Sequence, residues 1–249
     1  MPQIFPKSIN PLARAILIGL PMLGGLVGVT LATFFRSGYA TGVGEVVPQP
    51  VAFSHAHHVG QLGIDCRYCH TTVEVSGFAN IPPTKTCMNC HQQMWVGSGM
   101  LAPVRESWET NRPVEWNRVN NLPHYAFFNH SIHVAKGVGC ATCHGRLDEM
   151  NLTYQSQTLL MEWCIDCHRA PEKNLRPKSE VFSMTWTPAA GGKWKPEDFG
   201  FFGRMPDGSE HPLIGQDRPK TQAELGKLLK EEYHVRDQGT LTGCSMCHR

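Results

Sequence analysis

The sequence lacks the features by which nucleic-acid-binding proteins are recognised. It contains no basic run and no known nucleic-acid-binding motif, and its formal net charge is only +2. Long hydrophobic stretches are equally scarce, because residues 15–35 form the one extended uncharged apolar segment. We therefore expect no nucleic acid partner and a single crossing of a membrane.

The chain also has no spare cysteine, because all ten cysteines fall into five Cys-x-x-Cys-His units. Zinc knuckles contain such cysteine pairs too, but they usually work in twos and five is odd. A disulfide framework outside the cytoplasm would not require a histidine after every pair. The spacing is instead typical of covalent c-type haem attachment. The units are Cys66–His70, Cys87–His91, Cys140–His144, Cys164–His168 and Cys244–His248.

Haem chemistry explains the spacing within each unit. Two thiols three positions apart can each form a thioether with one vinyl group of the same haem, and the next histidine is then held beneath the iron as its proximal ligand. The sequence thus predicts five covalently attached haem c groups. The thioether residues are Cys66, Cys69, Cys87, Cys90, Cys140, Cys143, Cys164, Cys167, Cys244 and Cys247, and the proximal ligands are His70, His91, His144, His168 and His248.

Glycine, proline and the predicted haems limit the amount of regular structure. The chain has 24 Gly and 18 Pro in 249 residues, and five haems leave about fifty residues for each. The porphyrins must then supply much of the buried apolar surface. We expect a mainly α protein with much irregular structure, in which an N-terminal transmembrane helix precedes a multihaem domain organised around five haems.

Residues 15–35 are expected to anchor the chain in a membrane. As a helix they would reach about 31 Å, which is enough for one bilayer crossing. A cleaved signal peptide is the alternative, since Gly38-Tyr39-Ala40 offers small residues for a peptidase, but signal peptides usually have only about 7 to 15 apolar residues. We favour an uncleaved anchor in a bacterial cytoplasmic membrane. Covalent haem attachment in bacteria takes place outside the cytoplasm, so the haem domain is expected on the periplasmic side.

A haem that only passes electrons needs a second axial ligand, and a repeated Phe-x-His-x-x-His pattern offers four. The pattern starts at Phe53 and again at Phe128, 75 residues later, and the haem units that follow are shifted by 74 and 77 residues. The chain is therefore a duplicated two-haem module with a fifth haem added at the C-terminus. Positions i and i+3 share a helix face, so each pair can serve two neighbouring irons. His57 has no counterpart and is expected to be solvated, and the predicted distal ligands are His55, His58, His130 and His133.

The fifth haem needs a distal ligand from outside these pairs. His234 is the first candidate, because Thr221 and Glu224 predict a capped helix to about Tyr233, which ends ten residues before Cys244. Methionine is an equally sound ligand and would raise the potential of that haem. The alternatives are His124, His211, Met94, Met100 and Met161.

These features divide the chain into six parts. Residues 171–220 are rich in Pro, Gly and charge but carry more aromatic residues than a disordered linker, so we expect an irregular loop that covers a haem or docks a partner. The parts are an anchor at 1–36, a linker at 37–50, the first two-haem module with a connecting segment at 51–125, the second module at 126–170, this loop at 171–220, and a C-terminal helix with the fifth haem at 221–249.

The two modules, the single anchor and the stretches Ile81–His91 and Gly137–Arg146 together carry a family resemblance. They resemble the pentahaem cytochrome subunit of bacterial alternative complex III over nearly the whole chain, most specifically at 53–170 and 231–249. The module itself is similar to the small multihaem cytochromes of the class III and c7 type.

The resemblance implies a subunit of a quinol-oxidising respiratory or photosynthetic membrane complex. Its partners would be an iron–sulfur subunit, quinol-binding integral membrane subunits, a monohaem cytochrome c and a periplasmic electron acceptor. The residues favour electron transfer independently, because an iron with both axial positions filled does not readily bind substrate. We therefore expect no catalytic residue and no catalysis by the chain alone. The alternatives are a nitrite-type multihaem reductase with one open haem, and a stand-alone quinol dehydrogenase.

Overall fold

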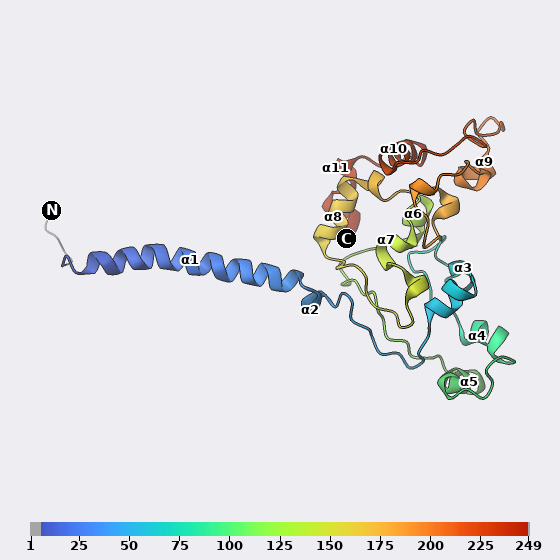
Figure 1. The fold of residues 1–249 in the computed structure, drawn as a ribbon, viewed down its shortest axis with the longest axis horizontal. Helices are drawn as coiled ribbons and strands as arrows, with labels where there is room; N and C mark the ends of the chain where they lie inside the picture. The colour runs from blue at the N-terminus through green and yellow to red at the C-terminus, as the bar shows by residue number, and fades with distance from the viewer. Residues whose placement is uncertain (1–5, 249) are drawn as a thin grey trace. The chain divides into compact units, whose positions relative to one another are not determined.

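The computed structural model describes residues 6–248, apart from the side chains of Phe201 and Phe202. Residues 1–5 of the expected anchor and Arg249 of the fifth-haem segment lie outside this range. The chain forms two compact units, of which the first ends at Val43 and the second begins at Gly44. Between residues 6 and 248 the regular structure is helical, with four isolated β-bridges and no strand (Figure 1). The predicted mainly α fold is confirmed.

The first unit consists mainly of α1 (Ile9–Arg36), whose 28 residues extend over about 42 Å. With a mean hydropathy of 2.1 over an 18-residue window, α1 is long and apolar enough to cross a membrane, and none of its residues is buried in the protein. Pro21 lies inside α1 without ending it. The hydroxyls of Thr30 and Thr33 donate to backbone carbonyls one turn earlier, so these polar groups are satisfied within the helix. A short helix, α2 (Gly38–Thr41), follows in the expected linker.

The second unit is built from short helices and turns. Each Cys-x-x-Cys segment forms a helical turn: α3 (Cys66–Cys69), α4 (Thr84–His91), α7 (Cys140–His144), α8 (Met161–Arg169) and α12 (Cys244–Cys247). The other helices are the π-helix η1 (Ala56–Gln61), α5 (Ala102–Thr110), α6 (His130–Ala135), α9 (Gly200–Gly203), α10 (Gln222–Glu232) and α11 (Gln238–Leu241). The 3₁₀ turns are η2 (Gly99–Leu101), η3 (Leu147–Glu149), η4 (Pro171–Lys173), η5 (Lys178–Glu180), η6 (Pro188–Ala190) and η7 (Pro196–Asp198).

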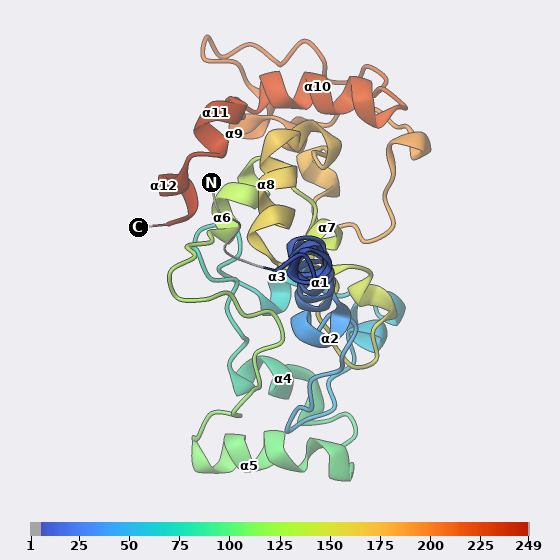
Figure 2. The ribbon, with the colours of Figure 1, turned by 90° about the vertical axis from the view of Figure 1, so that its left-hand side faces the viewer.

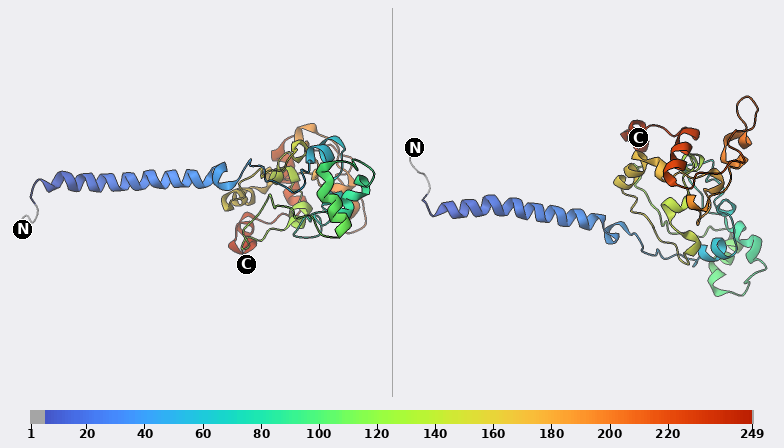
Figure 3. Two further views of the ribbon diagram at one scale, coloured as in Figure 1. Left: turned by 90° about the horizontal axis from the view of Figure 1, so that it is seen from below. Right: turned by 45° about the horizontal axis from the view of Figure 1, so that its top comes forward.

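Two clusters of buried apolar side chains stabilise opposite ends of the second unit. Figure 2 shows α4 and α5 at one end and α10 at the other, and the right-hand view of Figure 3 separates the same two ends. The smaller cluster joins α4 to α5 through Val51, Met88 and Val104. The larger cluster consists of Leu175, Trp194, Phe199, Leu225, Leu229 and Tyr233. Aromatic residues of 171–220 thus pack against α10 in the larger core.

Gly226 allows α10 to pack closely against the backbone of η4. A Cβ atom at this position would overlap the carbonyl oxygen of Glu172. We therefore expect Gly226→Ala to destabilise the second unit by about 1–3 kcal/mol, because the helix must move away from η4. Calorimetric melting of the haem-loaded protein measures the loss, with Lys227→Ala on the exposed side of α10 as the control. An unchanged melting temperature for Gly226→Ala would contradict this close contact.

Candidate haem sites

Three of the five proximal histidines face a second imidazole ring from the predicted distal set. A metal ion held between two imidazoles by bonds of about 2 Å keeps their ring centres about 6.3 Å apart. The three pairs have this spacing, so their residues fit the two axial ligands of one haem iron. The ring centres are 6.2 Å apart for His58 and His91, 6.4 Å for His130 and His144, and 6.2 Å for His133 and His168.

Backbone carbonyls hold the distal imidazoles in these positions. The Nδ1 atoms of His58 and His133 donate to carbonyls one turn earlier, at 2.8 and 2.7 Å, and His130 donates to the carbonyl of Gly77 at 2.8 Å. A carbonyl can only accept, so Nδ1 carries the proton and Nε2 is the free nitrogen of each ring. Metal-binding histidines in proteins are commonly oriented in this way.

Backbone carbonyls also orient three of the proximal imidazoles. His70, His168 and His248 donate from Nδ1 to carbonyls, whereas Nδ1 of His144 lies 3.2 Å from the side-chain amide nitrogen of Asn120, which is a donor. The acceptor is the carbonyl of Asn80 for His70, at 2.6 Å, that of Leu241 for His168, at 2.9 Å, and that of Tyr125 for His248, at 3.0 Å. Sequence reasoning missed these partners, because they lie far along the chain from the histidines they orient. The one local signal in the sequence is Asn80 itself, because asparagine often adopts the positive φ that marks a turn, and its φ is 70°.

His55 is the fourth predicted distal ligand, and the charge of His70 acts on its ring. Its Nδ1 atom is 2.9 Å from Oγ1 of Thr153. Burial, with smaller contributions from the charges of His70, His58 and His144, lowers the pKa of His55 to about 4. Burial also lowers the pKa of His144 to about 4. Because a histidine binds metal in its neutral form, these surroundings favour ligation by both rings.

The two Phe-x-His-x-x-His copies have nearly the same geometry. Phe53 stacks on His58 and Phe128 stacks on His133, with ring centres 4.5 Å apart in both copies. Each phenylalanine also meets the first histidine of its copy edge-on, at 4.9 and 4.8 Å. The first copy leads into the π-helix η1 and the second into the α-helix α6. Aromatic contacts therefore reproduce the arrangement despite the different helix types.

His234, the first candidate for the fifth distal ligand, makes no ring contact with His248 among the described residues. His234 follows the end of α10 with a positive φ of 47°, and it is exposed. Among the described residues, the aromatic ring beside His248 belongs to Tyr125, at 5.9 Å. The carbonyl of Tyr125 accepts from Nδ1 of His248 at 3.0 Å. The assignment of His234 stays a prediction.

His211, another alternative for the fifth ligand, has both ring nitrogens engaged. Nε2 lies 2.9 Å from a carboxylate oxygen of Glu232, and Nδ1 accepts from the backbone N–H of Leu213 at 3.3 Å. The ring is buried and stacks on Phe199, with centres 3.8 Å apart. These contacts assign His211 to the packing around α10.

A His234→Met variant tests the fifth assignment in the haem-loaded protein. If His234 binds the fifth iron, we expect one midpoint potential to rise, because thioether ligation favours the ferrous state. A redox titration followed by visible absorption measures the change, and His124→Met is the control. An unaltered titration for His234→Met would move the ligand to His124 or to a methionine.

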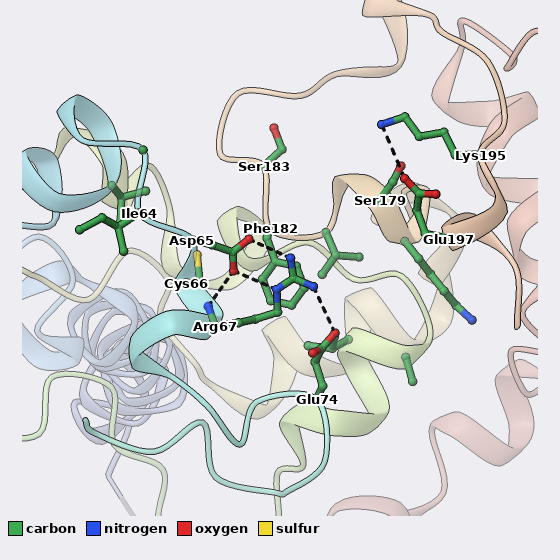
Figure 4. A pocket seen from close by; sticks show the side chains of 16 residues that line it. Ile64, Asp65, Cys66, Arg67, Glu74, Ser179, Phe182, Ser183, Lys195 and Glu197 are labelled. Atoms are coloured by element: carbon green, nitrogen blue, oxygen red, sulfur yellow. Dashed lines mark hydrogen bonds and ion pairs between the residues drawn. The ribbon is translucent and has the colours of Figure 1, made fainter. Parts of the chain in front are cut away.

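A cavity of about 670 Å³ opens beside Cys66 (Figure 4). Val134 and Phe182 contribute apolar surface to its wall. The guanidinium of Arg67 lies over the Phe182 ring at 4.4 Å and pairs with Asp65 at 2.9 Å. The rest of the wall is largely polar, with Glu74, Lys178 and Glu197 among its charged residues.

No profile of a known protein family matches the chain. The chain is 32% identical over 143 residues to the multihaem cytochrome c subunit of menaquinone reductase from Nitratidesulfovibrio vulgaris. The match covers 48% of this chain and 67% of that relative. The chain belongs to the multihaem cytochromes c. As a member of this family, the cytochrome carries covalently bound haem c.

Proposed function

We propose that the chain is a membrane-anchored pentahaem cytochrome c that relays electrons within a quinol-oxidising complex of the alternative complex III type. The imidazole pairs at 6.2–6.4 Å carry this proposal. An iron with both axial positions filled exchanges electrons and offers no open position to a substrate. The relative, a subunit of menaquinone reductase, supports a link to quinol.

Each haem is assigned two axial histidines under this proposal, with the haems numbered by their order in the sequence. When bound, haem iron supplies a one-electron couple, while the residues of the chain hold and orient it. Where Nδ1 donates to a carbonyl, that carbonyl fixes the ring and increases the basicity of Nε2. Haem 1 takes His70 and His55, haem 2 His91 and His58, haem 3 His144 and His130, haem 4 His168 and His133, and haem 5 His248 and His234.

The proposal also places the chain in a bacterial cytoplasmic membrane. The apolar helix α1 supports an anchor, and the extracytoplasmic attachment of haem c in bacteria supports a periplasmic haem domain. The proposed partners are an iron–sulfur subunit, quinol-binding integral membrane subunits and a monohaem cytochrome c. Electrons would leave for a periplasmic acceptor.

The experiment compares the isolated haem-loaded chain with the complex purified through a tag on this chain from native membranes. Menaquinol should reduce the haems in the complex and leave the isolated chain oxidised, because quinol oxidation belongs to other subunits. Quinol oxidation by the isolated chain would instead support a stand-alone quinol dehydrogenase. Turnover of nitrite by the isolated chain would support a reductase, and either result would overturn the proposal.

A further inference from the structure

We propose that the haems do not follow their sequence order along the electron path, but lie in the order haem 2, haem 1, haem 3, haem 4, haem 5. This order rests on the proposed five-haem assignment and adds to it which haems are neighbours. Four contacts establish the neighbours in turn. Each transfer oxidises one ferrous iron and reduces the next ferric iron, and no bond is made or broken.

Haems 1 and 2 are joined by one turn of the chain. His55 and His58 are three residues apart at the start of η1, and Phe53 contacts both rings, at 4.9 and 4.5 Å. The His58 ring faces His91 of haem 2, with ring centres 6.2 Å apart, and His55 is the proposed partner of His70 on haem 1. The two irons are therefore held from adjacent sides of a single short helix.

Haems 3 and 4 are joined in the same way by α6. His130 faces His144 of haem 3, and His133 faces His168 of haem 4. Both distal rings contact the ring of Phe128, with ring centres 4.8 and 4.5 Å away. The second module thus repeats the neighbour relation of the first.

The contact between the two modules involves haem 1, and this reverses the sequence order of the first two haems. The loop after His70 supplies the carbonyl of Gly77, which accepts from Nδ1 of His130 at 2.8 Å. The next residue, Ser131, donates its N–H to the carbonyl of Ser76 at 3.1 Å. The distal ligand of haem 3 is therefore oriented by the loop of haem 1.

The thiols of the two units agree with this contact. Cys66 of haem 1 and Cys140 of haem 3 lie close enough for each thiol to shift the pKa of the other. By contrast, α4, which carries the haem 2 unit, packs against α5 at the far end of the second unit (Figure 2). Haem 1 therefore lies between haem 2 and the second module.

Haem 5 follows haem 4 at the other end of the path. Nδ1 of His168 donates to the carbonyl of Leu241 at 2.9 Å, in α11, three residues before Cys244. The same helix that carries Cys164, α8, therefore contacts the segment that leads into the fifth unit. Haems 2 and 5 become the two ends of the path, so redox partners should exchange electrons near α4 on one side and α12 on the other.

The positions of the five irons in crystals of the haem-loaded chain, located by anomalous scattering, test the order directly. We expect iron 1 to be the member of the first module nearest to iron 3, with iron 2 farther from it. An iron 2 that lies closer than iron 1 to iron 3 would overturn the order. A crystal with fewer than five irons would contradict the pentahaem proposal, while the order of the bound haems could still be read.

A matched pair of haem deletions tests the same order in the assembled complex. Cys66→Ala/Cys69→Ala removes haem 1 and should split the remaining haems into kinetically separate groups of one and three during stopped-flow reduction. Cys87→Ala/Cys90→Ala removes haem 2 and should keep the remaining four in one connected group. The reverse pattern would overturn the order. If either variant does not assemble into the complex, the iron positions located by anomalous scattering decide the haem order.

Discussion

Replacing His133 by alanine converts one haem of the oxidised protein from low spin to high spin and leaves its thioether bonds intact. The His133 ring lies 6.2 Å from that of His168, the spacing of two axial ligands on one iron, and its Nδ1 donates to Asn129. Loss of this ring opens one axial position, which weakens the ligand field at that iron. Electron paramagnetic resonance measures the new high-spin signal, and a pyridine haemochrome assay measures the attached haem.

His57→Ala is the matched control for this change. His57 belongs to the same histidine cluster as His58, but its Nδ1 lies 2.8 Å from Oε1 of Gln61 and its ring stacks on Trp95. We expect this variant to keep every haem low-spin. Unchanged low-spin haems in His133→Ala would show that His133 is not an iron ligand and would remove the strongest support for the second module.

Replacing Asp198 by alanine should destabilise the core around α10 by about 3 kcal/mol, because it removes the fully buried partner of a buried arginine, Arg218, and leaves it only the carboxylate of Glu180 at 3.1 Å. The Asp198 side chain is fully buried, and Arg218 is 4% exposed. Nη2 of Arg218 donates to Asp198 at 2.6 Å, and the backbone N–H groups of Ser179 and Lys195 donate to the same carboxylate at 3.0 and 2.9 Å. One substitution thus removes three hydrogen bonds from the turns of residues 171–220.

Calorimetry of the haem-loaded protein should show a fall of about 10 °C in the melting temperature of Asp198→Ala. Asp207→Ala is the control, since Asp207 is an exposed aspartate in the same part of the chain. The melting temperature of Asp198→Asn should lie between those of Asp198→Ala and Asp207→Ala, because an amide keeps a hydrogen-bond acceptor but not the negative charge. Equal melting temperatures for Asp198→Ala and Asp207→Ala would contradict a structural role for the buried pair.

Short-range signals in the sequence predicted local structure well. Thr221 and Glu224 predicted a capped helix to about Tyr233, and α10 runs from Gln222 to Glu232 with the N–H of Glu224 donating to Thr221. The apolar stretch 15–35 predicted a long helix, and α1 covers Ile9–Arg36. Capping and apolar length act within a few turns, so they can be read from neighbouring residues.

Long-range features could not be predicted, because they depend on how the modules pack. Nothing near His130 indicates that Gly77, 53 residues earlier, accepts its Nδ1 proton. The sequence repeat also did not predict that the first copy continues as a π-helix and the second as an α-helix. The fifth distal ligand shows the same limit, since the capped helix was predicted correctly whereas the ligand role of His234 stays a prediction.

The number and spin state of the haems in the purified protein test the central claim most directly. The account predicts five haem c groups per chain by pyridine haemochrome assay and mass spectrometry, all low-spin in the oxidised protein and unchanged by cyanide or nitrite. Fewer than five attached haems would contradict the pentahaem assignment. A high-spin haem whose spectrum shifts with cyanide or nitrite would contradict an electron relay in which every iron has two axial ligands.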